Sequence, residues 1–415
     1  MFYLKYYLVL IKIFFAQDIT KIVKRIIYKK KRHKNDVVFI EGINHFYSSL
    51  KKTKRALVTL PPFAWHEALK QEPNIKNFNF IGLLYEIVKN LNQHGFVVDI
   101  LDLENDNYTL QYQYDLMVGH GGGIKNVILQ ISNDVPILQY VSGAYHEGFI
   151  EETERRYNRF KERNNISENI GIKRRMLDII EGESFLTKNA NFLFSCFAPR
   201  MIETFKEEKN KFFFTGLAAY VDKRLYVKKS KKNFINGRNN FIYVGGTNGN
   251  IQKGADLIIE AFAKTPNANL YIYCELEGEI IKYYKKELNL PNIIYIYHYK
   301  FFKGILNRLM HKINFTIHAP INTGLGTAFA GSLGVGLIPV GYVDIMKDEE
   351  WNILCDNPTV DELVVCIQKA IGKDYVWYKN AAEKTIRFYN EYWTPTNFSN
   401  KFNELISLTI NERKI

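Results

Sequence analysis

The chain has 415 residues, 47% of them apolar, and a formal net charge of +13 at pH 7. This length exceeds the range in which a single core keeps growing, so we expect two domains. The apolar content excludes a disordered chain. Residues 1–55 hold 14 Lys and Arg against three acidic residues, a local net of +11 that leaves +2 for the other 360 residues. Because most of the excess positive charge is confined to one end, we expect no nucleic-acid partner.

The N-terminal segment, residues 1–34, combines apolar and basic patterns. Residues 2–16 are almost wholly apolar and aromatic, but the run is too short for a membrane span. Residues 19–27 show an apolar helical stripe opposite lysines, and a basic cluster follows at 29–34. This pattern predicts a helix lying on an anionic membrane surface, with the protein peripheral on the inner face of the cell membrane. A cleaved signal peptide, a helix packed on the protein's own body and one short transmembrane anchor are the alternatives.

Alternating strand and helix patterns predict a first α/β domain over residues 50–225. The expected strands are 55–60, 96–103, 115–119, 136–143, 190–195 and 212–216. A loop carrying Trp65 and His66 is expected after the first strand, and a helix over 80–95. Further helices are expected from about residue 124 and within 151–180. This alternation is typical of a doubly wound parallel sheet.

A Lys- and Asn-rich stretch, residues 228–240, reads as a linker to a second α/β domain over 235–375. Its expected strands are 241–246, 270–274, 293–297, 315–320 and 337–342, with a helix over 254–264. Residues 376–415 are predicted to be helical, broken at Trp393–Pro395, and to pack back on the first domain. Two Rossmann-like domains facing a cleft suit a bound ligand, although periplasmic binding proteins, epimerases and transferases all share such a plan.

The four cysteines (Cys196, Cys274, Cys355 and Cys366) show neither a CxxC motif nor metal-ligand spacing. They are therefore interpreted as reduced and structural, which suits a cytoplasmic compartment.

Two glycine-rich loops in the second domain carry the functional signal. In the first, Gly245 and Gly246 follow a strand, and Lys253 and Gly254 stand where the next helix begins. Main-chain N–H groups at a helix N-terminus beside a cation make a phosphate site, although a glycine-rich turn with a solvated lysine has the same pattern.

The second loop strengthens the phosphate interpretation. It runs from the strand near Ile317 through Gly324, Leu325 and Gly326 to a small-residue helix that begins near Thr327. The glycines allow a close approach of the backbone to a ligand, and the helix dipole points at the same place. Two helix N-termini from neighbouring strand–helix units then converge on one anionic group, and a pyrophosphate fits that geometry.

These loops resemble the donor-binding half of retaining family-4 glycosyltransferases, which have the GT-B fold. The likeness covers residues 240–375 and, more weakly, 55–220, where the segment beginning at Tyr140 is similar to the acceptor half of some bacterial members. The resemblance implies a nucleotide-sugar donor bound by the residues of both loops, with Thr323 among them. The family's two glutamates fall on Thr323 and Gly331, so their contacts to the sugar and the ribose cannot be carried over.

The expected chemistry is metal-independent glycosyl transfer, with no cofactor. Lys253, the amides of residues 324–326 and the helix beginning near Thr327 would stabilise the leaving diphosphate. No Asp-x-Asp motif stands in a loop suited to a metal. Lys253 and His146 are the candidate catalytic residues.

The candidate acceptor-side residues are His66, His120, Gly121 and Glu147, together with His146. The three histidines are expected at the carboxyl ends of strands or in the loops that follow, the edge where ligands bind in this architecture. A histidine in a polar loop is also commonly a surface or structural residue. His146 is the strongest candidate because Glu147 is placed to orient it.

The sequence therefore predicts a glycosyltransferase that moves a sugar from a nucleotide-sugar to a glycan or lipid-linked acceptor, in bacterial surface polysaccharide or glycoconjugate synthesis. Because both glutamates are replaced, the alternative is a catalytically degenerate GT-B protein that binds nucleotide or glycan. An epimerase or a phosphorylase fits less well, since the expected carboxylates and Schiff-base lysine are not evident.

Overall fold

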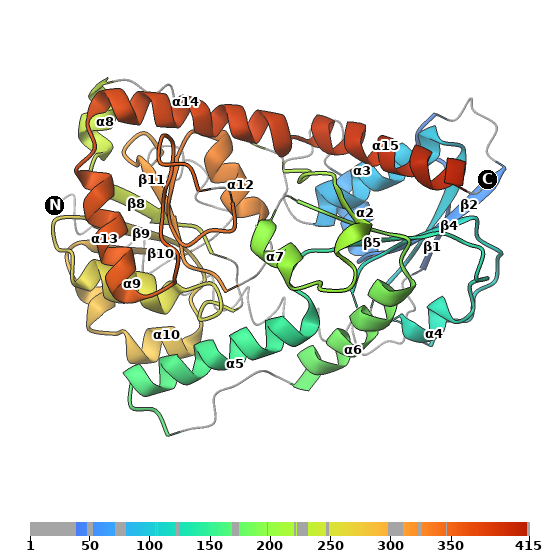
Figure 1. The fold of residues 1–415 in the computed structure, drawn as a ribbon, viewed down its shortest axis with the longest axis horizontal. Helices are drawn as coiled ribbons and strands as arrows, with labels where there is room; N and C mark the ends of the chain where they lie inside the picture. Colours follow the sequence, from blue (N-terminus) through green and yellow to red (C-terminus); the bar gives the residue numbers. More distant parts are fainter. Residues whose placement is uncertain are drawn as a thin grey trace. The chain divides into compact units, whose positions relative to one another are not determined.

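The computed structural model describes residues 39–47, 53–70, 80–103, 105, 107–121, 124–167, 174–196, 198–219, 221, 231–245, 249–297, 310–321, 326–345 and 347–412. Residues 40–415 form one compact unit, which contains two sheets with helices around them (Figure 1). The segment 1–34, predicted to bind a membrane surface, lies outside the described residues. No helix in the described part of the chain has the length and apolar character needed to cross a membrane.

The first sheet has seven strands among the described residues, in the order β1-β3-β2-β4-β5-β6-β7. The strands are β1 (Phe39–Ile43), β2 (Lys54–Thr59), β3 (Phe96–Leu101), β4 (Leu116–Gly119), β5 (Ile137–Tyr140), β6 (Phe192–Ser195) and β7 (Phe212–Phe214). In this order, each strand from β3 to β7 is parallel to the next one. Burial on both faces explains why β2 and β4 read as continuous apolar runs and not as alternating ones.

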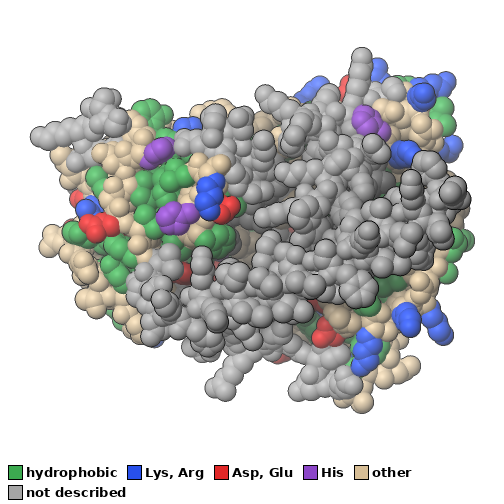
Figure 2. Space-filling model, turned by 180° about the vertical axis from the view of Figure 1, so that it is seen from behind, with side chains coloured by type: hydrophobic (Ala, Val, Ile, Leu, Met, Phe, Trp, Pro, Cys, Tyr) green, Lys and Arg blue, Asp and Glu red, His purple; other side chains and the backbone are tan. Residues whose placement is uncertain are grey.

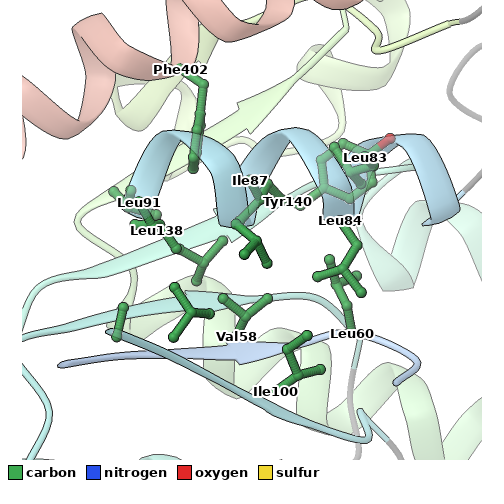
Figure 3. Packing of buried hydrophobic residues seen from close by; sticks show 14 of the residues in the cluster. Val58, Leu60, Leu83, Leu84, Ile87, Leu91, Ile100, Leu138, Tyr140 and Phe402 are labelled. Atoms are coloured by element: carbon green, nitrogen blue, oxygen red, sulfur yellow. The ribbon is translucent and has the colours of Figure 1, made fainter. Parts of the chain in front are cut away.

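The helices that accompany the first sheet follow its strands in sequence. They are α2 (Phe63–Leu69), α3 (Phe80–Gln93), α4 (Lys125–Ile128), α5 (His146–Arg163), α6 (Arg174–Asn189) and α7 (Pro199–Glu203), with a short 3-10 turn, η1, at Lys209–Lys211. One face of the sheet is covered by α3 and by helix α15 (Pro395–Glu412). Figure 3 shows Leu84 and Ile87 of α3 directed at Val58 and Ile100 on the strands, with Phe402 reaching the same core from α15.

The second sheet has six strands among the described residues, in the order β10-β9-β8-β11-β12-β13, and its paired strands are parallel. They are β8 (Asn240–Tyr243), β9 (Asn269–Cys274), β10 (Ile293–Tyr297), β11 (Phe315–His318), β12 (Ile338–Gly341) and β13 (Ile353–Leu354). The accompanying helices are α8 (Lys231–Gly237), α9 (Ala255–Ala263), α10 (Gly278–Tyr283), α12 (Thr327–Gly334), α13 (Val360–Ile371) and α14 (Tyr375–Tyr392), with a 3-10 turn, η3, at Glu287–Asn289.

The chain returns to the first sheet through α14 and α15, which meet at the predicted break. Trp393 is fully buried there, and its carbonyl accepts a hydrogen bond from the Ala219 N–H at 3.2 Å. Tyr389 Oη donates to the Ala219 carbonyl at 2.6 Å. The segment before the second half is thereby tied to the helices that follow it, and the predicted crossing helix is confirmed.

Four local predictions were wrong or incomplete. Trp65 and His66 lie on helix α2, not in a loop, because the Pro61–Pro62 turn leads directly into a helical turn. The expected linker contains α8, whose Phe234 is buried against Tyr378 at 4.8 Å between ring centroids. The edge strands β1 and β13 were not predicted; β13 has only two residues.

All four cysteines are buried, and none of them is in a disulfide bond. Figure 2 shows the molecule from behind, where the basic side chains of the described residues stand in small separate groups, some of them beside acidic ones.

Candidate active site

The first glycine-rich loop connects β8 to α9, and its described part, residues 249–254, is a compact turn. Gly254 caps the helix in a left-handed conformation, with φ at +80°. A Cβ placed there would lie 2.2 Å from the carbonyl oxygen of Ala319, so only glycine fits. Ile321 N–H also donates to the Gln252 carbonyl at 2.9 Å. The turn after β8 is thus packed against the segment after β11, and these two strands are neighbours in the sheet.

Lys253 lies in this turn, partly buried, immediately before the glycine cap. Burial lowers the pKa of its ammonium group, while the nearby Glu277 carboxylate acts in the opposite direction. The helix that follows begins at Ala255, so the lysine stands at a helix N-terminus as predicted. A cation in this position attracts an anionic ligand.

The main-chain N–H groups of the turn are less available than the sequence suggested. Glu277, which follows β9, accepts hydrogen bonds from the N–H groups of Gly249 and Asn250 at 2.7 and 2.9 Å. Its own N–H donates to Asn250 Oδ1 at 2.7 Å. The N–H groups of Lys253, Gly254 and Ala255 bond to carbonyls within the turn. These five N–H groups of the turn are therefore already engaged within the protein. Gly245 is the last described residue after β8, and Gly246 lies outside the described residues.

The second loop leads from β11 into α12, which begins at Thr327 as predicted, with Gly326 as its N-cap. Gly326 is extended, and its carbonyl accepts hydrogen bonds from Phe329 and Ala330 at 3.0 and 3.1 Å. Thr323, Gly324 and Leu325 lie outside the described residues. Because α9 and α12 follow adjacent parallel strands, their N-termini lie at the same edge of the sheet.

His318, at the end of β11, is a buried histidine that the sequence did not single out. Its Nε2 lies 2.9 Å from Thr316 Oγ1, and its ring packs on Phe329 at 4.7 Å between centroids. Burial lowers the pKa of this imidazole to about 3. His318 is therefore neutral, and it packs at the carboxyl end of β11.

The candidate histidines of the first half lie in three different settings. His66 is exposed on α2. His120 follows β4 and is buried, with Nδ1 2.9 Å from the Tyr140 carbonyl oxygen, and burial lowers its pKa. Gly121 is left-handed, with φ at +82°. Helix α2, which carries His66, follows β2, and β2 pairs with β4, the strand that His120 follows.

His146 is the first residue of helix α5 and not a loop residue. Its Nδ1 is shielded from solvent and has no hydrogen-bond partner among the described residues. Burial is the main cause of its lowered pKa, the Glu147 carboxylate opposes this effect, and Lys188 reinforces it. Glu147 was expected to orient the imidazole. Its carboxylate is 82% exposed and lies 3.9 Å from Nε2, which is too far for a hydrogen bond.

Helix α5 links the two halves of the chain. Its buried Arg156 donates from Nε to the Ile251 carbonyl at 3.1 Å and from Nη2 to the Ala319 carbonyl at 3.3 Å. Arg156 and Arg163 also pair with the buried Asp256 in the first turn of α9. Figure 1 shows α5 running beside α10, where Phe160 packs on Tyr283 at 5.9 Å. The helix that begins at His146 is thereby attached to the turn that carries Lys253.

Sequence reasoning missed Arg156, Asp256 and Glu277 because each acts on a residue far away in the chain. Within the described residues, no group of three or more His, Cys, Asp or Glu side chains is arranged to hold a metal ion.

No protein-family model matches the sequence, and no curated protein matches it. Several solved structures do match over nearly their whole length. Sucrose-phosphate synthase from Thermosynechococcus elongatus has a TM-score of 0.59 at 10% identity, over 86% of this chain and 99% of that one. Anabaena HepE, solved with UDP and glucose, has a TM-score of 0.52 at 12% identity, over 85% and 99%. The lipopolysaccharide outer core galactosyltransferase WaaB has 0.51 at 10%, over 86% and 100%.

These structural neighbours are GT-B glycosyltransferases, and the match covers both parallel sheets of this chain. The protein has the GT-B fold.

Proposed function

We propose that the protein is a glycosyltransferase that moves a sugar from a nucleotide-sugar donor, held by its second half, to a glycan or lipid-linked acceptor. The observation that carries this proposal is the turn of residues 249–254. It presents the partly buried Lys253 at the start of α9, packed against the segment after β11. The UDP in the HepE structure makes UDP-sugars the first donors to test.

The chemistry follows from charge development during transfer. As the glycosidic bond to the donor breaks, positive charge grows on the sugar ring and negative charge on the leaving diphosphate. Lys253 and the N-terminus of α12 would stabilise that negative charge without moving, because the turn and the helix are already fixed by internal hydrogen bonds. In this proposal neither a divalent metal nor a cofactor is needed, so chelators leave the rate unchanged.

His146 is proposed to face the acceptor. It stands at the start of α5 with a shielded, unpartnered Nδ1 among the described residues, and its lowered pKa keeps it neutral near pH 7. A neutral imidazole can accept a hydrogen bond from a sugar hydroxyl or take up its proton. The resemblance to retaining family-4 enzymes favours a retained configuration at the transferred sugar.

The decisive experiment is a transfer and hydrolysis assay with a panel of UDP-, GDP- and ADP-sugars, with and without EDTA. Lys253→Ala should weaken nucleoside diphosphate binding at least about tenfold, because a charged hydrogen bond is lost. Lys264→Ala is the matched control, since Lys264 stands at the other end of the same helix and is exposed. If no nucleotide-sugar is used but nucleoside diphosphates still bind, the catalytically degenerate alternative is favoured.

His146→Ala tests the acceptor side separately. We expect a lower kcat with unchanged nucleoside diphosphate affinity, while His311→Ala, at an exposed position before β11, should leave both unchanged. An unaltered kcat for His146→Ala excludes the role proposed for this residue.

The membrane proposal rests on the sequence of residues 1–34. Deletion of this segment should move the protein from the membrane fraction to the soluble fraction, and binding to vesicles with anionic lipid should fall as salt is raised. Continued membrane association after deletion contradicts the proposal.

A further inference from the structure

Arg200 joins the two halves of the chain at the carboxyl ends of both sheets. It is the second residue of α7, which follows β6. Its main-chain N–H donates to Asp344 Oδ1 at 2.8 Å, and the N–H of Met201 donates to Asp344 Oδ2 at 2.9 Å. Asp344 is buried in the segment after β12. The start of α7 is therefore already capped by a carboxylate. A ligand at this place would be bound by the Arg200 side chain and not by these main-chain N–H groups.

The Arg200 guanidinium is held by a hydrogen bond to the Tyr342 side chain and lies near the Asp344 carboxylate, but one of its nitrogens is left without a partner in the described part of the chain. Its Cζ lies 4.2 Å from the ring centroid of Tyr342, which fixes the plane of the group. Its Nη1 is shielded from solvent and has no hydrogen-bond partner among the described residues. Asp344 is the carboxylate beside it, and both of its oxygens accept main-chain hydrogen bonds. A shielded cationic N–H without a partner is costly unless a ligand supplies the acceptor.

A second unpartnered nitrogen comes from the neighbouring element. Thr204, the C-cap of α7, accepts a hydrogen bond from the Tyr145 N–H at 2.8 Å. That contact places the end of α7 against the first turn of α5. His146, in this turn, has the shielded and unpartnered Nδ1 already described. Two adjacent elements thus each offer a nitrogen without a protein partner, and one of them belongs to a permanent cation.

We infer that Arg200 binds an oxyanion of phosphate type carried by one of the substrates. This inference rests on the proposed function and deepens it. A guanidinium offers parallel N–H groups that match two phosphate oxygens, which an ammonium group cannot do. The phosphate has two sources, the diphosphate of the donor or a second phosphate on the acceptor. Both present the same oxygens to Arg200.

The test compares Arg200→Gln and Arg200→Lys with the wild-type full chain. Both variants keep the main-chain bonds to Asp344, so the fold should be retained, and thermal unfolding checks this. Arg159→Gln is the matched control, because Arg159 is an exposed arginine on α5. One arm titrates UDP by calorimetry. The other titrates inorganic phosphate in the presence of saturating UDP.

If Arg200 binds the donor diphosphate, Arg200→Gln loses at least about tenfold in UDP affinity. If it binds a second phosphate, UDP affinity stays and the phosphate titration shows the loss. In either case Arg200→Lys should recover only part of the affinity. Unchanged binding in both arms, in a folded Arg200→Gln protein, overturns the inference.

If the proposed function is wrong, the titrations give a different result from those above. If the wild-type protein neither binds UDP nor transfers any sugar, phosphate and pyrophosphate are titrated alone. A loss specific to Arg200→Gln then supports the oxyanion site without the transferase, and no loss overturns the inference as well.

Discussion

Arg156 and Asp256 form an ion pair between the two halves of the chain, with side chains only 4% and 0% exposed and Nη2 3.4 Å from Oδ1. Arg156 also holds the carbonyls of Ile251 and Ala319. One arginine from the first half thus fixes both segments that flank the proposed donor site. The pair is therefore expected to stabilise the fold and to order the donor turn.

Arg156→Met should lower the free energy of unfolding by about 3–5 kcal/mol, because it leaves buried polar groups without partners. Urea denaturation at pH 7.5 measures the loss. The exposed pair of Lys264 and Asp361 is the control, since an exposed pair contributes about 0–1 kcal/mol. An equally small effect at Arg156 contradicts the structural role given to it.

Gly254→Ala should destabilise the protein by more than about 2 kcal/mol. The φ of +80° at this position is left-handed, which strains any residue other than glycine. The added Cβ would also lie 2.2 Å from the Ala319 carbonyl oxygen. Gly278→Ala is the control, because Gly278 begins α10 and a Cβ there meets no described atom within 4 Å. Thermal unfolding of the two variants should separate them clearly. Similar melting temperatures contradict the packing described for the turn.

Glu277→Gln should cost about 1–3 kcal/mol, because an amide cannot accept from two N–H groups with two oxygens as the carboxylate does. We also expect weaker UDP binding, since the turn that carries Lys253 loses its anchor. Glu279→Gln, on the first turn of α10, serves as the control. Tighter UDP binding by Glu277→Gln means instead that the carboxylate competes with phosphate for these N–H groups.

His318 should make stability depend on pH. Its pKa in the folded protein is about 3, against 6.5 when unperturbed, so below pH 6.5 the unfolded chain binds a proton that the folded chain does not. The stability due to this group is fully present above pH 6.5 and falls as the pH drops toward 3. His318→Leu should flatten the acid side of a plot of unfolding free energy against pH. An acid-side slope that His318→Leu leaves unchanged contradicts the burial described for this imidazole.

The strands and long helices could be predicted because their signals are local. The apolar runs at Arg55–Leu60 and Phe96–Leu101 end at prolines, glycines or charges, and α3 keeps an apolar stripe over its whole length. Short elements were missed for the opposite reason. Helix α2 has seven residues and strand β13 only two, too few for a periodic pattern to emerge.

The candidate site could be predicted only where its residues stand in a motif. Lys253 and Gly254 occupy the predicted helix start because glycines and a lysine after a strand have a local geometric meaning. Arg156 and Asp256 are 100 positions apart, and Arg200 and Asp344 are 144 apart. Such pairs depend on how the two halves meet. A single sequence holds no local signal for that contact.

Helix α15 has a consequence for the order of folding during synthesis. Phe398, Phe402, Leu405 and Ile406 are fully buried in the core of the first sheet, although they follow the whole second sheet in the sequence. During synthesis the core of the first sheet is therefore closed only after the second half has been made, while the second sheet is assembled from residues close together in sequence. A ribosome-stalled chain ending near residue 394 should leave that first core open to chaperones and proteases, so the second half is expected to become protease-resistant before the first.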